Sequence, residues 1–248
     1  MAQPRQLDRP PITEALIDLR AQSQLSPDDF KALGKELHQR FPKMQVMEGM
    51  RAELRVEQGK LIAPKSELLG FQGIQLTSAD ETLVVRFQPG GFTFHNLKSY
   101  VGGDRLIEDA LTLWSHFSEK GRPGAVSRVG MRYINHLRIS LQDGEFLSRY
   151  LVAIPELPES APQRVSEFSA RVVAHEDNST AVIVRELRPG SAGAVLLIDI
   201  DVFQPGPSPS GHAELRGVLD SLRILKNRVF FSLLTEHTLA AYELRTNS

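Results

Sequence analysis

The chain has 248 residues, of which 41% are hydrophobic and 24% carry a charge. This composition is typical of a folded protein and excludes a largely disordered one. The 29 basic and 30 acidic side chains give a formal net charge of -1, so we expect no general attraction to nucleic acid or to a membrane surface. The absence of cysteine excludes disulfides, thiolate metal sites and a cysteine nucleophile.

The first half of the chain is predicted to be an α+β unit at residues 10–121, preceded by a flexible arm at residues 1–9. Apolar and polar residues alternate over residues 12–21, which predicts a strand. Ser26 and Pro27 are typical of a helix start, and apolar residues follow at helical spacing. An antiparallel meander and a second helix, which begins after Gly103, complete this half; the meander strands are 52–57, 70–78, 82–88 and 92–97.

The second half is predicted at residues 122–248 and opens with a strand at residues 126–140. A short helix at residues 146–152 is followed by strands at 167–175, 181–187 and 194–203. The Pro-, Gly- and Ser-rich segment at residues 204–211 is predicted to be a loop. A helix begins near His212, and a further helical piece is expected up to about Leu244.

The two halves have the same predicted order of elements. Residues 15–20 (Ala-Leu-Ile-Asp-Leu-Arg) and 133–138 (Tyr-Ile-Asn-His-Leu-Arg) also match in polarity. We therefore predict two pseudo-repeated β-α-β(4)-α halves, with antiparallel sheets and helices on one face. That order resembles the TATA-binding-protein and helix-grip architectures, a likeness of fold that does not determine function.

Four motifs carry a second resemblance. They are Pro10-Pro-Ile-Thr-Glu-Ala15, Arg128-x-Gly-x-Arg-Tyr-Ile-Asn135, Ile198-Asp-Ile-Asp-Val-Phe203 and Leu225-Lys-Asn-Arg-Val-Phe-Phe-Ser232. Together they resemble a sporadically distributed family of uncharacterised bacterial proteins. The resemblance implies a bacterial cytosolic protein, and it brings no established activity and no catalytic residues. The start of the chain also lacks the apolar run of a signal peptide, so we expect a cytoplasmic location.

Asp199 and Asp201 are the most prominent polar pair, because residues two apart on a strand share one face. With Glu186 from a neighbouring strand they could hold Mg²⁺ or Mn²⁺, as in a metal-dependent phosphohydrolase or nuclease. The favoured alternative is a lattice of ion pairs with Arg128 and Arg132, which also share a face.

The two arginines have another possible role, since guanidinium groups suit an anionic ligand. They would then stand at the mouth of a small-ligand cavity. Glu14 and Asp18 are the equivalent polar pair on the opening strand of the first half, and pairing with Arg20 or Arg86 is the expected fate of these carboxylates. Asn135 is predicted to be a buried hydrogen-bonding residue.

The sequence contains no recognisable catalytic set, cofactor motif or phosphate-binding loop. We therefore predict a non-enzymatic binding or interaction module without a cofactor, whose partner is another protein or a second copy of the chain. From the sporadic distribution of the family that it resembles, this partner is expected in a bacterial defence or toxin–antitoxin system.

Overall fold

The computed structural model has a single nine-stranded antiparallel sheet as its main element. From one edge to the other the strands are β3 (Lys43–Glu57), β4 (Lys60–Thr77), β5 (Leu83–Gln88), β6 (Gly91–Leu97), β2 (Ile12–Arg20), β7 (Val126–Ile139), β10 (Gly193–Ser208), β9 (Ser179–Gly190) and β8 (Phe168–Glu176). The structure describes residues 6–57, 60–98, 100–139, 147–154, 157–162, 165–190, 193–208, 211–242 and 244–245, with the backbone alone for 6, 51–57, 60–66 and 244–245.

The prediction of two repeated halves is wrong. Strands β2 and β7, which open the expected halves, pair with each other at the centre of the sheet, with Ala15 opposite Tyr133. In the described residues, three strands of the main sheet (β8, β9 and β10) lie between β7 and α3, one fewer than a β-α-β(4)-α half requires. A 3-10 turn, η1 (Leu147–Arg149), stands where a helix was expected. The likeness to the TATA-binding-protein and helix-grip architectures depended on this repeat and is not supported. Residues 10–121 and 122–248 instead contribute to one continuous sheet.

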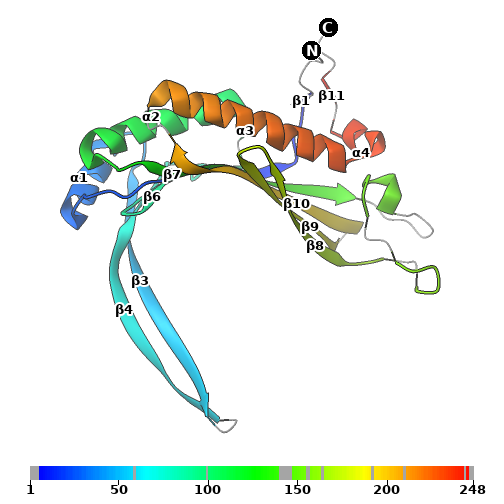
Figure 1. Cartoon of the computed structure of the whole chain (residues 1–248), viewed down its shortest axis with the longest axis horizontal. Helices are drawn as coiled ribbons and strands as arrows, with labels where there is room; N and C mark the ends of the chain where they lie inside the picture. The colour runs from blue at the N-terminus through cyan, green and yellow to red at the C-terminus, as the bar shows by residue number, and fades with distance from the viewer. Residues whose placement is uncertain are drawn as a thin grey trace.

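The α-helices in the described part of the chain are α1 (Pro27–Glu36), α2 (Gly103–Gly121), α3 (His212–Leu233) and the short α4 (Glu236–Ala240). Helix α3 contacts β7 and β10, and α2 runs beside α3 and contacts β2 and β6 (Figure 1). Helix α1 contacts β4 and begins at a capping box, in which Ser26 and Asp29 bond each other's backbone amides. In the part of the chain that the structure describes, no helix is long and apolar enough to span a membrane.

The core lies between α2, α3 and the face of the sheet that they contact. Alternate residues of the central strands, such as Ile17, Met131 and Ile200, are fully buried there. Aromatic rings fill the space between α2 and the strands, with Trp114 and Phe117 packed against Phe87 and Phe92. The opposite side of the central strands, which we call the open face, carries the residues that alternate with this core.

Strands β3 and β4 extend beyond the rest of the sheet. Strand β4 pairs with β5 only from Ile74 to Thr77, so the outer parts of β3 and β4 pair with each other alone. We call residues 48–57 and 60–72 the β-ribbon, and Figure 1 shows it projecting from the body. Gly73, with φ +136°, stands at its base, where a Cβ would meet the carbonyl of Phe87. Glycine is therefore required where the ribbon leaves the sheet.

Three further details differ from the sequence prediction. Residues 6–7, expected in a flexible arm, form β1 (Gln6–Leu7), which pairs with β11 (Leu244–Arg245). Residues 204–208, expected in a loop, continue β10, because Gln204 lies opposite Val129. The last helical piece is only α4, which ends before β11.

Candidate functional site

The candidate site residues gather on the open face of the three central strands. Alternation places Glu14 and Asp18 of β2, Arg128 and Arg132 of β7, and Asp199 and Asp201 of β10 on that side. Because β7 lies between β2 and β10, its arginines have carboxylates on both flanks. We call this set the charged lattice.

Arg128 binds two carboxylates from opposite sides. Its Nη1 donates to Asp18, and its Nη2 donates to both oxygens of Asp201 at 2.8 Å. The guanidinium also lies 4.4 Å from the ring centroid of Phe203, a cation–π contact. Arg20 donates to the same Asp18 at 3.2 Å, as the sequence predicted for one of the β2 carboxylates. Arg128 therefore joins three adjacent strands.

Gly130 explains the spacing of the Arg-x-Gly-x-Arg motif. It lies opposite Asp18 on one side and Phe203 on the other. A Cβ at this position would stand 2.8 Å from Cζ of Arg128. The Arg128 side chain therefore lies over the glycine, and any larger residue would compete with the guanidinium for that space.

Arg132 forms a bidentate pair with Asp199. Its Nε and Nη2 donate to the two carboxylate oxygens at 2.8 and 2.5 Å. This hydrogen bonding raises the pKa of Arg132, and burial opposes it. The residue directly opposite Arg132 is Asp201, so each arginine reaches diagonally along β10 to its carboxylate. Burial raises the pKa of Asp201, whereas the adjacent Arg128 acts in the opposite direction.

Glu14 has a partner that the sequence did not suggest. Nδ1 of His95 lies 2.7 Å from Oε1 of Glu14 and donates to it, and this bond lowers the pKa of Glu14. Arg86, the expected partner, instead donates to Gln75 at 2.8 Å. The available signal was the alternation over residues 92–97, which places His95 on the open face beside β2.

The proposed metal ligands are bonded to arginines. Asp199 and Asp201 bind Arg132 and Arg128, and Glu186 is bonded by Arg188. Among the residues that the structure describes, no group of three or more His, Asp or Glu side chains is arranged to hold a metal ion. The observed arrangement of Asp199 and Asp201 is the ion-pair lattice favoured from the sequence.

On the core side of β7 a buried polar cluster accompanies the lattice. Asn135 is buried, as predicted, and its Nδ2 donates to the carbonyl of Ile198 at 3.0 Å. Lys226 of α3 is only 7% exposed, and its Nζ lies 3.8 Å from the ring centroid of Tyr133. Tyr133 in turn shares a 3.2 Å hydrogen bond with Tyr100.

Burial dominates the ionisation of this cluster. It lowers the pKa of Lys226 to about 7, and nearby Arg223 acts in the same direction. It also raises the pKa of Tyr133 well above its usual value. Sequence reasoning missed Lys226, because lysine at one position of an apolar helical pattern normally faces water.

The comparisons with known proteins concern the sequence of the whole chain, to which the charged lattice and the buried cluster belong. No family model and no curated protein matches it. The resemblance to a bacterial family therefore stays a prediction.

Proposed function

We propose that this chain is a non-enzymatic binding module, in which the charged lattice holds the sheet together and the β-ribbon contacts another protein. The observation that carries the proposal is the exposed apolar pair on the ribbon. Met50 and Leu68 lie directly opposite each other and are 67% and 78% exposed. Leu69, beside them, is also exposed. Apolar side chains grouped in this way on a projection are typical of contact surfaces.

The pattern of the ribbon supports a protein partner. Along β3, apolar Met50, Ala52, Leu54 and Val56 alternate with charged Arg51, Glu53, Arg55 and Glu57. The register places residues of opposite charge across from each other, Arg51 with Glu67 and Glu53 with Lys65. An isolated two-stranded hairpin is only marginally stable in water, so packing against a partner would stabilise it.

The lattice supports a structural role for the central charges. The guanidinium groups of Arg128 and Arg132 are already bonded to carboxylates, so an anionic ligand would have to displace Asp18, Asp199 or Asp201. Breaking a partly buried pair of this kind costs about 3 kcal/mol or more. We therefore assign recognition to the ribbon and not to this face, and a partner from a bacterial defence or toxin–antitoxin system remains the first to test.

The experiment is affinity capture from cells of the native host with a tagged chain. The double substitution Met50→Lys with Leu68→Glu replaces the apolar pair by an opposite-charge pair at the same register, which preserves the hairpin. The matched control is Ile224→Lys, at a 68% exposed position on α3. We expect the wild type and the control to retain the same partner and the double variant to lose it. Equal capture by all three would contradict the proposal.

The metal-dependent phosphohydrolase is tested separately by calorimetric titration with Mn²⁺. Because Asp199, Asp201 and Glu186 are bonded to arginines, we expect no saturable binding. Saturable binding that the Asp199→Asn substitution abolishes would establish the metal site in place of the binding module.

A further inference from the structure

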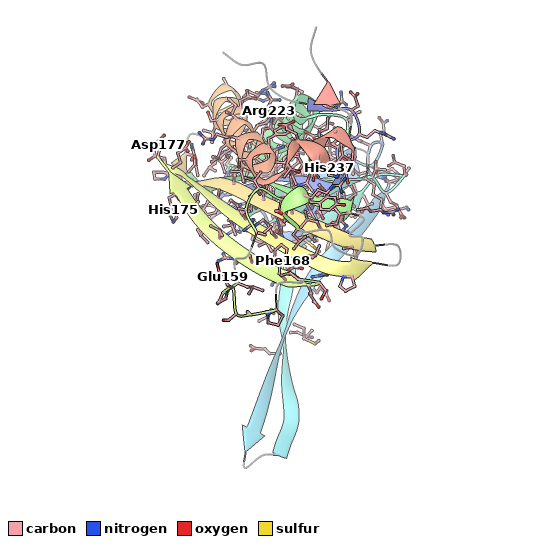
Figure 2. All side chains as sticks on the ribbon, turned by 90° about the vertical axis from the view of Figure 1, so that its right-hand side faces the viewer. Glu159, Phe168, His175, Asp177, Arg223 and His237 are labelled. Atoms are coloured by element: carbon pink, nitrogen blue, oxygen red, sulfur yellow. The ribbon has the colours of Figure 1, made fainter. Side chains whose placement is uncertain are left out.

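The two edges of the sheet are unusually accessible to pairing. Strand β8 runs for nine residues beside β9 without a register shift, and no described strand pairs with its outer edge. It contains no proline, and Val172 and Val173 are 46% and 42% exposed. Figure 2 shows β8 along the margin of the body, with Phe168 and His175 labelled on it. Edge strands are normally protected against pairing by proline, bulges or short length.

The opposite edge is β3, whose outer part belongs to the β-ribbon. This strand also lacks proline, and among the described strands only β4 pairs with it. Unlike β8, the outer part of β3 lies away from the body, because it belongs to the projecting ribbon (Figure 1). In the described residues the ribbon therefore presents the outer edge of β3 and the part of β4 before Ile74, which contains Pro64, and β8 presents a further unpaired edge at the far end of the same sheet.

We propose that the ribbon edge of one copy pairs with β8 of a second copy, and that the contact is made twice in a two-fold symmetric dimer. The inference rests on the proposed function, in which the ribbon binds a protein, and it identifies that protein as another copy of this chain. The two outermost strands of each sheet, β3 and β8, would then both be paired along their outer edges. Backbone hydrogen bonds along the joined strands would supply the affinity, as in β-strand addition.

The lengths of the two edges agree. Residues 48–57 of β3 span about 33 Å, at about 3.3 Å per residue, and the nine residues of β8 span about 30 Å. Between the register shifts at Gly49/Met50 and Glu53/Arg55, the outward-facing backbone groups of β3 therefore have potential partners on β8.

The buried area favours a reciprocal dimer over a single contact. A strand edge about 33 Å long, in a sheet about 10 Å thick with its side chains, covers about 330 Å² of its partner, which amounts to about 660 Å² over both surfaces. Stable interfaces bury about 1,200 Å² or more, so one ribbon contact is too small. Two-fold symmetry doubles the buried area to about 1,300 Å², which reaches that threshold. A partner that offered only one strand edge would not.

Charge is compatible with self-association. The whole chain has a formal net charge of -1, so two copies repel each other only slightly. On the ribbon, the register sets residues of opposite charge across from each other. The ribbon therefore has no excess charge that would favour a strongly acidic or basic partner.

The test uses thiol cross-linking, because the chain has no cysteine of its own. Chains carrying Met50→Cys and chains carrying Val173→Cys, with tags of different size, are mixed and treated with a short bismaleimide. Such a reagent tolerates a register difference of about two residues. We expect a cross-linked heterodimer. The control replaces Val173→Cys by Ile224→Cys, which is more exposed but lies on α3, and should give at least a tenfold lower yield.

Sedimentation of the full-length chain gives the second measurement. We expect a dimer for the wild type and a monomer for Met50→Lys with Leu68→Glu, with unchanged circular dichroism. A monomeric wild type, or cross-linking to Ile224→Cys as efficient as to Val173→Cys, would overturn the inference. If the wild type is monomeric and yet captures a host protein through the ribbon, the dimer is refuted and the proposed function stands. If capture fails as well, both are refuted.

Discussion

Replacing Lys226 by methionine should stabilise the protein at neutral and acidic pH. Lys226 is 7% exposed, and burial lowers its pKa from 10.5 to about 7. Its folded-state pKa therefore lies below that of the unfolded chain. Between about pH 7 and pH 10.5 the unfolded chain binds a proton that the folded chain has released, so the stability of the wild type rises with pH across this range. Below about pH 7 both states are charged, and the full penalty of burying the ammonium applies.

The size of the penalty follows from the same pKa. Each unit corresponds to about 1.4 kcal/mol, so the change from 10.5 to about 7 amounts to about 5 kcal/mol. The cation–π contact with Tyr133 favours the charged form by up to about 2 kcal/mol. We therefore expect Lys226→Met, which keeps an unbranched side chain of similar length, to raise the free energy of unfolding by about 3 kcal/mol at pH 6. This advantage should fall toward zero as the pH approaches 10.

Urea unfolding at pH 6 and pH 9 measures the gain in the free energy of unfolding and its decrease with pH. The fluorescence of Trp114, the single tryptophan, is the probe. The matched control is Lys120→Met, at an exposed position on α2 where lysine is paired with Glu36. Its effect on stability should be small and should depend little on pH. If Lys226→Met destabilises the protein equally at pH 6 and pH 9, the reasoning about a costly buried ammonium is refuted.

Three further predictions concern named contacts. Gly130→Val should displace Arg128 from its carboxylates and lower the free energy of unfolding by about 3 kcal/mol in urea; an unchanged midpoint would exclude the packing argument. Ser26→Ala removes the cap of α1 and should lower the free energy of unfolding by about 1 kcal/mol. An unchanged thermal stability would show that the cap is dispensable. The bond from His95 lowers the pKa of Glu14, so this bond stabilises the fold above pH 4.5 and the stabilisation disappears as the pH falls through the folded-state pKa. Glu14→Gln should therefore weaken the dependence of stability on pH below pH 4.5. Identical stability profiles of the variant and the wild type in acid would argue against this role of Glu14.

The ion pairs of the lattice could be predicted because they depend on local geometry. Alternation along a strand places Arg128 with Arg132, and Asp199 with Asp201, on common faces whatever the rest of the fold does. The partner that each charged side chain binds was harder to predict from the sequence. Each arginine bonds the carboxylate diagonal to it, and Glu14 bonds a histidine rather than an arginine, because the lateral order and register of strands decide these contacts.

The repeat failed for a related reason. The strands at residues 12–20 and 126–139 were identified, but their patterns do not say whether each pairs within its own half or with the other. The structure pairs them with each other. The full β-ribbon was also missed, since residues 60–69 contain Pro64 and lack sustained alternation, and the pattern did not predict a strand of 18 residues there.

The pairing of β2 with β7 makes the connection near Gly124 a natural place to divide the molecule. A chain cut there would yield two fragments, one ending after α2 and the other beginning before Val126. Each fragment would expose to water the hydrogen-bonding edge of its central strand, β2 or β7, which pairs with the other fragment in the intact protein. Neither is expected to remain soluble alone, whereas co-expression should let them reassemble. The fold thus lends itself to a split reporter whose reconstitution signals that two fused proteins have met.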